Sequence, residues 1–333
     1  MKFSLTGAFS VALALLAVDG IVAQDAATFP DIFSLPDGFR PEGVVAGPGT
    51  DIYVSCTRGL QVGAIWKGDI KTGVGSVFIA PTGDPTRGLS LDNQGRLWVA
   101  WIYGARVYDS ATGALLKEYR FVPDTNAVIN DVIVAGDKVI FTDSGSSVPN
   151  GRGETGVPRL FLLDLSATEL PEDFTELVVT SSVLNLDLGG PTLNGIETVP
   201  ADSSKAVACH TNLGILVNID LTTGEATEVP LENAGPRPAN TCDGLVRRGK
   251  TLYIVRNRDS IVSEVSLNPD GTEGVLEQDY PLTSIIADPN LDTPTTGALY
   301  GDYLYMPDSR FRLNCAAVDC NVAPFSVYRI KLN

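Results

Sequence analysis

The chain has 333 residues and a formal net charge of −16, with 24 basic and 40 acidic side chains and one histidine. This acidity argues against a role in binding nucleic acid or an anionic membrane surface, because both carry negative charge. We therefore expect a monomer whose partner is a small-molecule substrate, with no nucleic acid and no membrane.

Residues 1–23 have the pattern of a secretory signal peptide. Lys2 gives a basic start, residues 8–18 are apolar but too short to span a bilayer, and Ala23 is a small residue suited to cleavage. An uncleaved anchor is the alternative, and the polar residues that follow disfavour it. The sequence predicts a secreted protein with one domain over residues 24–333.

Six segments of the chain open in the same way, with a polar side chain beside Gly or Asp and then a β-rich run. A second and a third β-rich run follow each opening, separated by Gly-containing turns. The openings fall at Glu42, Arg87, Asn130, Asn194, Asp243 and Thr296.

The step between openings is roughly 45 to 65 residues, close to the about 40 to 50 residues of a propeller blade. The sequence thus predicts an all-β protein, a six-bladed β-propeller of four-stranded antiparallel blades. A double-layer sandwich is the competing all-β interpretation, and the fixed phase of the repeat favours the propeller. The third unit is longer because of an insertion, residues 144–158 and 170–191, which we expect to form loops over one face.

Five cysteines in an oxidising compartment favour disulfide formation. Cys315 and Cys320 enclose a four-residue loop and are the first predicted bridge. Cys209 and Cys242, in adjacent blades, are a second candidate pair. Cys56 is then the odd thiol, expected to be buried and inert.

Four of the openings carry oxygen ligands. A single Asn-Gly or Asp-Gly is usually a turn, but matching repeat positions point to a common site. Because the first strand of each propeller blade lines the central channel, we expect Glu42, Asn130, Asn194 and Asp243 to converge at one mouth of it. Two carboxylates and two amide oxygens, without Cys or His, favour Ca²⁺ over zinc or copper.

Three further side chains follow second β-rich runs and are candidates for the substrate pocket: Asp143, His210 and Asp308. The alternative is that the two aspartates satisfy turns at strand ends and that the histidine has a structural role.

These motifs resemble the six-bladed propellers of the senescence-marker/gluconolactonase/luciferin-regenerating family, with paraoxonases and strictosidine-synthase-like proteins as more distant relatives. The resemblance covers roughly residues 35–333. It implies that Glu42, Asn130, Asn194 and Asp243 hold a catalytic divalent cation. Two departures stand out: Val128 occupies a position where gluconolactonases have a sugar-binding Arg, and His210 does not align with the catalytic histidines of paraoxonases.

The activity implied by the resemblance is metal-assisted hydrolysis of a small lactone or ester, with Asp243 activating water and Asn130 close to the substrate. Two alternatives stay open: a cyclase or condensing enzyme of a natural-product pathway on the same propeller, and a non-enzymatic binding propeller with a structural ion. The sequence has no Gly-rich phosphate loop and no Gly-x-Ser-x-Gly elbow, which argues against nucleotide chemistry and against a serine hydrolase.

Overall fold

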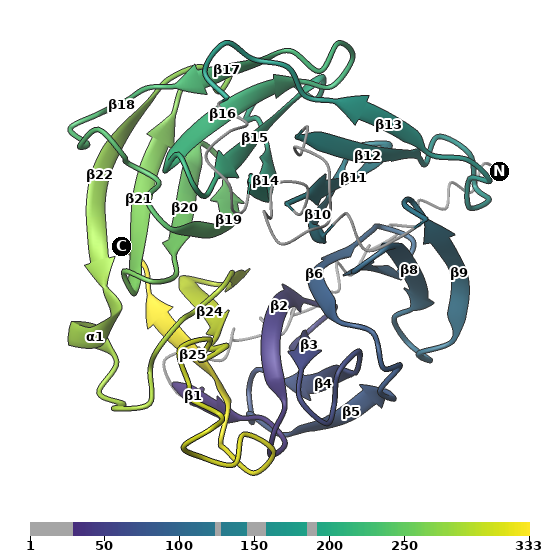
Figure 1. Ribbon diagram of the computed structural model, residues 1–333, viewed down its shortest axis with the longest axis vertical. Helices are drawn as coiled ribbons and strands as arrows, with labels where there is room; N and C mark the ends of the chain where they lie inside the picture. The colour runs from purple at the N-terminus through teal and green to yellow at the C-terminus, as the bar shows by residue number, and fades with distance from the viewer. Residues whose placement is uncertain (1–28, 124–127, 145–157, 185–191) are drawn as a thin grey trace, which may run out of the picture.

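The computed structural model describes residues 29–123, 128–144, 158–184 and 192–333, which form six sheets arranged in a ring (Figure 1). Each sheet contains four antiparallel strands, and one carries an additional short strand. The predicted six-bladed propeller is therefore confirmed. The predicted signal peptide, residues 1–23, lies outside the described residues.

The strands of each blade occupy equivalent places in the ring. The innermost strands are β2 (Arg40–Ala46), β6 (Thr86–Leu91), β10 (Ile129–Ala135), β14 (Leu193–Thr198), β19 (Cys242–Arg248) and β23 (Ala298–Tyr300). The second strands are β3 (Asp51–Arg58), β7 (Arg96–Trp101), β11 (Lys138–Asp143), β15 (Lys205–His210), β20 (Thr251–Arg256) and β24 (Tyr303–Pro307). The third strands are β4 (Ile65–Asp69), β8 (Gly104–Asp109), β12 (Arg159–Asp164), β16 (Ile215–Asp220), β21 (Ile261–Leu267) and β25 (Ser326–Lys331). The outer strands are β5 (Gly75–Ile79), β9 (Leu115–Arg120), β13 (Thr175–Val178), β17 (Ala226–Val229), β22 (Gly274–Pro281) and β1 (Ile32–Ser34). Beside β22 lie β18 (Leu231–Glu232) and the short helix α1 (Leu282–Ile285).

The ring closes through the start of the chain. Strand β1 pairs with β25 and completes the last blade, so that the first and last parts of the propeller share one sheet (Figure 1). Phe33 is only 1% exposed, and its ring lies 5.6 Å from that of Tyr305. This contact joins the closing strand to the core of the last blade.

The expected loops of the third unit are partly wrong. Within residues 170–191, Thr175–Val178 forms β13, which pairs with β12 as the outer strand of the third blade. The rest of the insertion includes residues 145–157 and 185–191, which lie outside the described residues.

Apolar side chains fill the space within and between the blades. Trp98 is fully buried beside Tyr119 of its own blade and Phe141 of the next. Both candidate disulfides, Cys315–Cys320 and Cys209–Cys242, are present, and Cys56 is a buried free thiol. Among the described residues, no helix has the length and apolar character needed to cross a membrane.

We expect the Phe33→Ala variant to lose about 3 to 5 kcal/mol of unfolding free energy, because a large buried ring is removed from the strand that closes the ring. Urea denaturation measures the loss. Ile32→Ala is the matched control, since Ile32 is on the same strand but 43% exposed. Equal losses in the two variants would contradict a role of the Phe33 contact in closure.

Candidate metal and substrate site at the channel mouth

The predicted openings are β-bulges. In five innermost strands, two consecutive residues have no partner on the second strand. These unpaired residues are 42–43, 87–88, 130–131, 194–195 and 243–244. A bulge leaves its residues unpaired and redirects their side chains. The motifs are thus strand irregularities, and the interpretation of each as an isolated turn does not hold.

Glycine follows four of the polar residues because neighbouring innermost strands approach each other closely there. A Cβ on Gly43 would lie 2.1 Å from the carbonyl oxygen of Arg87, and one on Gly195 would lie 2.6 Å from that of Asp243. A Cβ on Gly88 or Gly244 would lie equally close to atoms of Asp131 or Thr296 in the next blade. These distances are shorter than any normal van der Waals contact, so only glycine fits.

The bulges bring the four predicted ligands together. They line one small cavity at the channel mouth with Gly88, Gly244 and three further residues: the full set of polar lining side chains is Glu42, Asn130, Asp131, Asn194, Asp243, Thr295 and Thr296. No group of three or more His, Cys, Asp or Glu side chains suited to a metal ion occurs among the described residues. Of the four predicted ligands at the mouth, two are carboxylates and two are amides.

Both amides are held by their nitrogen atoms. Asn130 Nδ2 donates to Ser144 Oγ at 3.0 Å, and Asn194 Nδ2 donates to Asp243 Oδ1 at 2.8 Å. Among the described residues, no donor reaches either Oδ1 atom. The two amide oxygens are therefore left available to a ligand in the cavity that they line.

The two carboxylates differ in their hydrogen bonding. Asp243 accepts hydrogen bonds from Asn194 and, at 2.6 Å, from Asn257 Nδ2. Glu42 is 7% exposed, yet no donor in the described part of the chain reaches its carboxylate oxygens. Burial, together with the charge of Asp243, raises the pKa of Glu42 well above its usual value, and burial raises the pKa of Asp243 to about 6.

An unpartnered buried carboxylate is costly, and a bound cation would remove that cost. The donor set consists only of hard oxygen atoms, which suits Ca²⁺. The residues present therefore fit the implied cation.

Asp131 lies in the Gly position of the third blade and has a different role. Its carboxylate accepts the backbone N–H groups of Val132 at 2.9 Å and Ile196 at 3.1 Å, which joins blade three to blade four. Burial raises its pKa to about 7.

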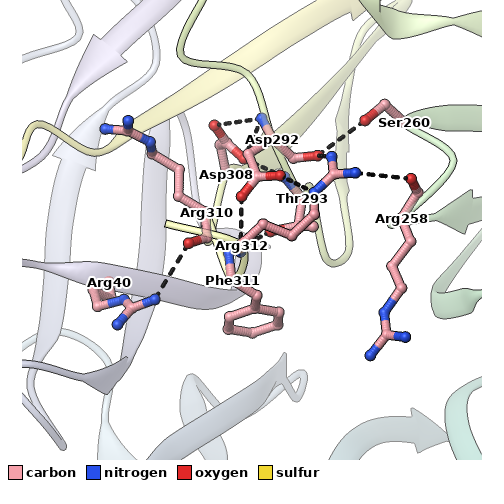
Figure 2. Close-up of polar contacts among 9 residues, drawn as sticks. All are labelled: Arg40, Arg258, Ser260, Asp292, Thr293, Asp308, Arg310, Phe311 and Arg312. Atoms are coloured by element: carbon pink, nitrogen blue, oxygen red, sulfur yellow. Dashed lines mark hydrogen bonds and ion pairs between the residues drawn. The ribbon is translucent and has the colours of Figure 1, made fainter. Parts of the chain in front are cut away.

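The three predicted pocket residues are all buried, and none lines the mouth cavity. Asp143 forms an ion pair with Arg159 at 2.8 Å. Asp308 accepts the backbone N–H groups of Asp292 and Thr293 and lies in a polar cluster between blades five and six (Figure 2). His210 Nδ1 accepts the N–H of Leu213, and burial lowers its pKa to about 4, so that the ring is neutral at pH 7. Their contribution to substrate binding stays a prediction.

Sequence reasoning missed two polar residues of the site. They are Asn257, which directly follows β20 and donates to Asp243, and Ser144, which directly follows β11 and accepts from Asn130. Arg87 marks a repeat opening, but its charge acts on Glu42 and Asp243. Polar residues that directly follow a second strand were the available signal for Asn257.

Replacing Gly43 with Ala is expected to cost about 1 to 3 kcal/mol of unfolding free energy, because the added Cβ meets the rigid backbone of the next blade. Chemical denaturation in the presence of a chelator measures this cost without a contribution from bound metal. Gly235→Ala is the control, since no atom lies within 4 Å of its added Cβ. Unchanged stability of Gly43→Ala would contradict the close approach.

The stability of the protein should fall as pH rises, partly because of Asp308. Burial raises its folded-state pKa to about 7, above the about 3.9 of an unfolded Asp. Its contribution is therefore fully present below about pH 4 and is lost as pH rises through about 7. Asp308→Asn keeps an acceptor oxygen and removes the titration, so its unfolding free energy should gain roughly 4 kcal/mol relative to wild type between pH 4 and 8. Unfolding free energies are measured by urea denaturation at each pH. If those of the two proteins change in parallel with pH, Asp308 is not the titrating group.

Comparison with known proteins identifies relatives of the fold. No protein-family model and no curated protein matches the chain. Regucalcin from Agrobacterium tumefaciens, described as a calcium-binding protein, is 17% identical with a TM-score of 0.60, covering 92% of this chain and 96% of regucalcin. A luciferin-regenerating enzyme is 12% identical with a TM-score of 0.61, covering 90% and 94%. A gluconolactonase from Xanthomonas campestris is 16% identical with a TM-score of 0.55, covering 92% of each chain. The resemblance inferred from the motifs is thus confirmed for the fold: the chain has the six-bladed propeller of the regucalcin and gluconolactonase type.

Proposed function

We propose that this protein is a secreted, calcium-dependent hydrolase of small lactones or esters. The observation that carries the proposal is the buried Glu42 carboxylate beside Asp243 and two amides. Among the described residues, no donor reaches the Glu42 carboxylate or the two amide oxygens. The gluconolactonase and calcium-binding descriptions of proteins with the same fold support it. Two disulfides are typical of an extracellular compartment and support secretion.

Glu42, Asn130, Asn194 and Asp243 would hold the cation through oxygen atoms. When bound, a divalent cation polarises the substrate carbonyl and stabilises negative charge on its oxygen. The interaction of Asn194 and Asn257 with Asp243 fixes its carboxylate and leaves lone pairs on both oxygens.

Asp243 is the proposed general base. As the oxygen of a water molecule bonds to the carbonyl carbon, one of its protons passes to the Asp243 carboxylate. The bond between that carbon and the ring oxygen then breaks, and the leaving oxygen takes the proton from Asp243. The net change is addition of one water to a lactone to give a hydroxy acid. Asn130, whose amide is oriented by Ser144, orients the substrate.

The test is hydrolysis of aliphatic, aromatic and sugar lactones by the purified protein with calcium and then with a chelator. We expect turnover to disappear on chelation and to return with calcium. Glu42→Gln and Asp243→Asn should each lower kcat/KM by at least about 100-fold, as expected for loss of a charged ligand or a general base.

Glu228→Gln, on the exposed outer strand β17, is the control and should keep full activity. Calorimetry should also detect calcium binding that Glu42→Gln weakens. Turnover that persists in the chelator, or in Glu42→Gln without bound calcium, would refute the proposal. Calcium binding without turnover of any lactone would favour a cyclase or a binding propeller.

A further inference from the structure

Three arginines in the described part of the chain have guanidinium groups without a polar partner there. Within the described residues, every other arginine donates a hydrogen bond or forms an ion pair, such as Arg159 with Asp143. No hydrogen bond or ion pair joins the guanidinium group of Arg58, Arg87 or Arg258 to another described residue. Arg58 and Arg258 are exposed, and Arg87 is half-buried with a buried Nη1 atom that lacks a partner.

All three lie around the same channel mouth. The carbonyl oxygen of Arg87 faces Gly43, the neighbour of Glu42. Arg58 ends β3 opposite Arg40, where β2 enters the mouth. Arg258 follows Asn257, the residue that donates to Asp243.

The charges of these arginines reach the two carboxylates. Burial dominates and raises the pKa of both groups, while Arg87 and Arg58 act in the opposite direction on Glu42, and Arg87 and Arg258 do so on Asp243. The three arginines come from blades one, two and five, and two adjacent residues contact two of them: the ring of Phe311 lies against Arg58, and Arg312 donates to the carbonyl oxygen of Arg258.

The other carboxylates near this mouth already have partners. Asp292 is paired with Arg312, and Asp308 accepts backbone N–H groups (Figure 2). Figure 2 also shows the Arg258 side chain extending away from this cluster, with only its carbonyl oxygen engaged by Arg312. The cluster therefore leaves the guanidinium group of Arg258 available to a ligand.

Arg58 is held in place by an aromatic ring. Its Cζ atom lies 5.0 Å from the ring centroid of Phe311, a cation–π contact that leaves the edge of the guanidinium group able to donate. An arginine whose guanidinium edge is free can bind a carboxylate through two hydrogen bonds.

The charge balance also favours an anionic ligand. The arginines offset the charges of Glu42, Asp131 and Asp243, and a divalent cation at the mouth would leave this region positive within a protein of net charge −16. We propose that the mouth accepts a lactone bearing a free carboxylate, which Arg58, Arg87 and Arg258 bind. The inference rests on the proposed function in that a lactone is the reacting group. The alternative is that the arginines only reduce the repulsion between Glu42 and Asp243.

The test compares 5-oxotetrahydrofuran-2-carboxylate with its neutral carboxamide as substrates of the calcium-loaded protein. We expect kcat/KM to be at least about tenfold higher for the carboxylate, since charge-assisted hydrogen bonds are about twice as strong as neutral ones. The double variant Arg58→Gln/Arg258→Gln changes two exposed residues and should bring the two substrates to within about twofold. Arg87→Gln should have the same effect if it folds.

Arg248→Gln is the matched control. It removes the same charge from an exposed arginine at the other end of β19 from Asp243, and it should keep the preference of wild type.

A binding measurement separates this inference from the proposed function. Tetrahydrofuran-2-carboxylate has no bond that the enzyme could hydrolyse. In calorimetry we expect it to bind the wild-type protein more tightly than tetrahydrofuran-2-carboxamide does. We expect its affinity to fall about tenfold in the double variant. If neither lactone is hydrolysed but this pattern holds, the hydrolase proposal fails and the anion site stands. If the carboxylate binds no more tightly than the carboxamide, or if Arg248→Gln weakens it equally, the inference is overturned.

Discussion

The close approach of neighbouring innermost strands is the constraint on which the site depends. Gly43, Gly88, Gly195 and Gly244 leave no room for a Cβ, because backbone or side-chain atoms of the next blade occupy that space. The bulges at the same positions free the preceding residues from the ladder. One structural device thus packs the blades around the axis and turns the ligand side chains to the channel mouth. In the third blade Asp131 replaces the glycine, and its carboxylate makes the connection to the next blade by accepting the backbone N–H of Ile196.

The arrangement of the blades was predictable because each repeat carries the same signal. Six openings in one phase specify six equivalent strands, and equivalence alone brings Glu42, Asn130, Asn194 and Asp243 to one axis. The closing strand β1 was not predictable, since three residues are too few to show alternation. Strand β13 was hidden inside an insertion. Arg58 and Arg258 belong to no repeated motif, so only the folded chain places them near the carboxylates.

Hydrogen bonding distinguishes the buried carboxylates from one another. Asp143, Asp131 and Asp308 each accept donors from the chain itself, and these contacts join adjacent segments or blades. Glu42 is 7% exposed and has no such donor among the described residues. A buried group that the fold leaves unsatisfied needs either a proton or an external partner. The oxygen-rich surroundings of Glu42 are the reason for which we propose a cation as that partner.

The charge of the whole protein and the charge of the mouth act over different ranges. A net charge of −16 repels an anion at a distance, but salt screens interactions between exposed charges beyond about 8 Å at physiological ionic strength. Within that distance the proposed anion would meet guanidinium groups that have no other partner among the described residues. Arg58 contacts the ring of Phe311, Arg87 lies in the bulge of β6, and Arg258 lies in the turn after β20. Local attraction to these groups can outweigh the repulsion of the distant surface.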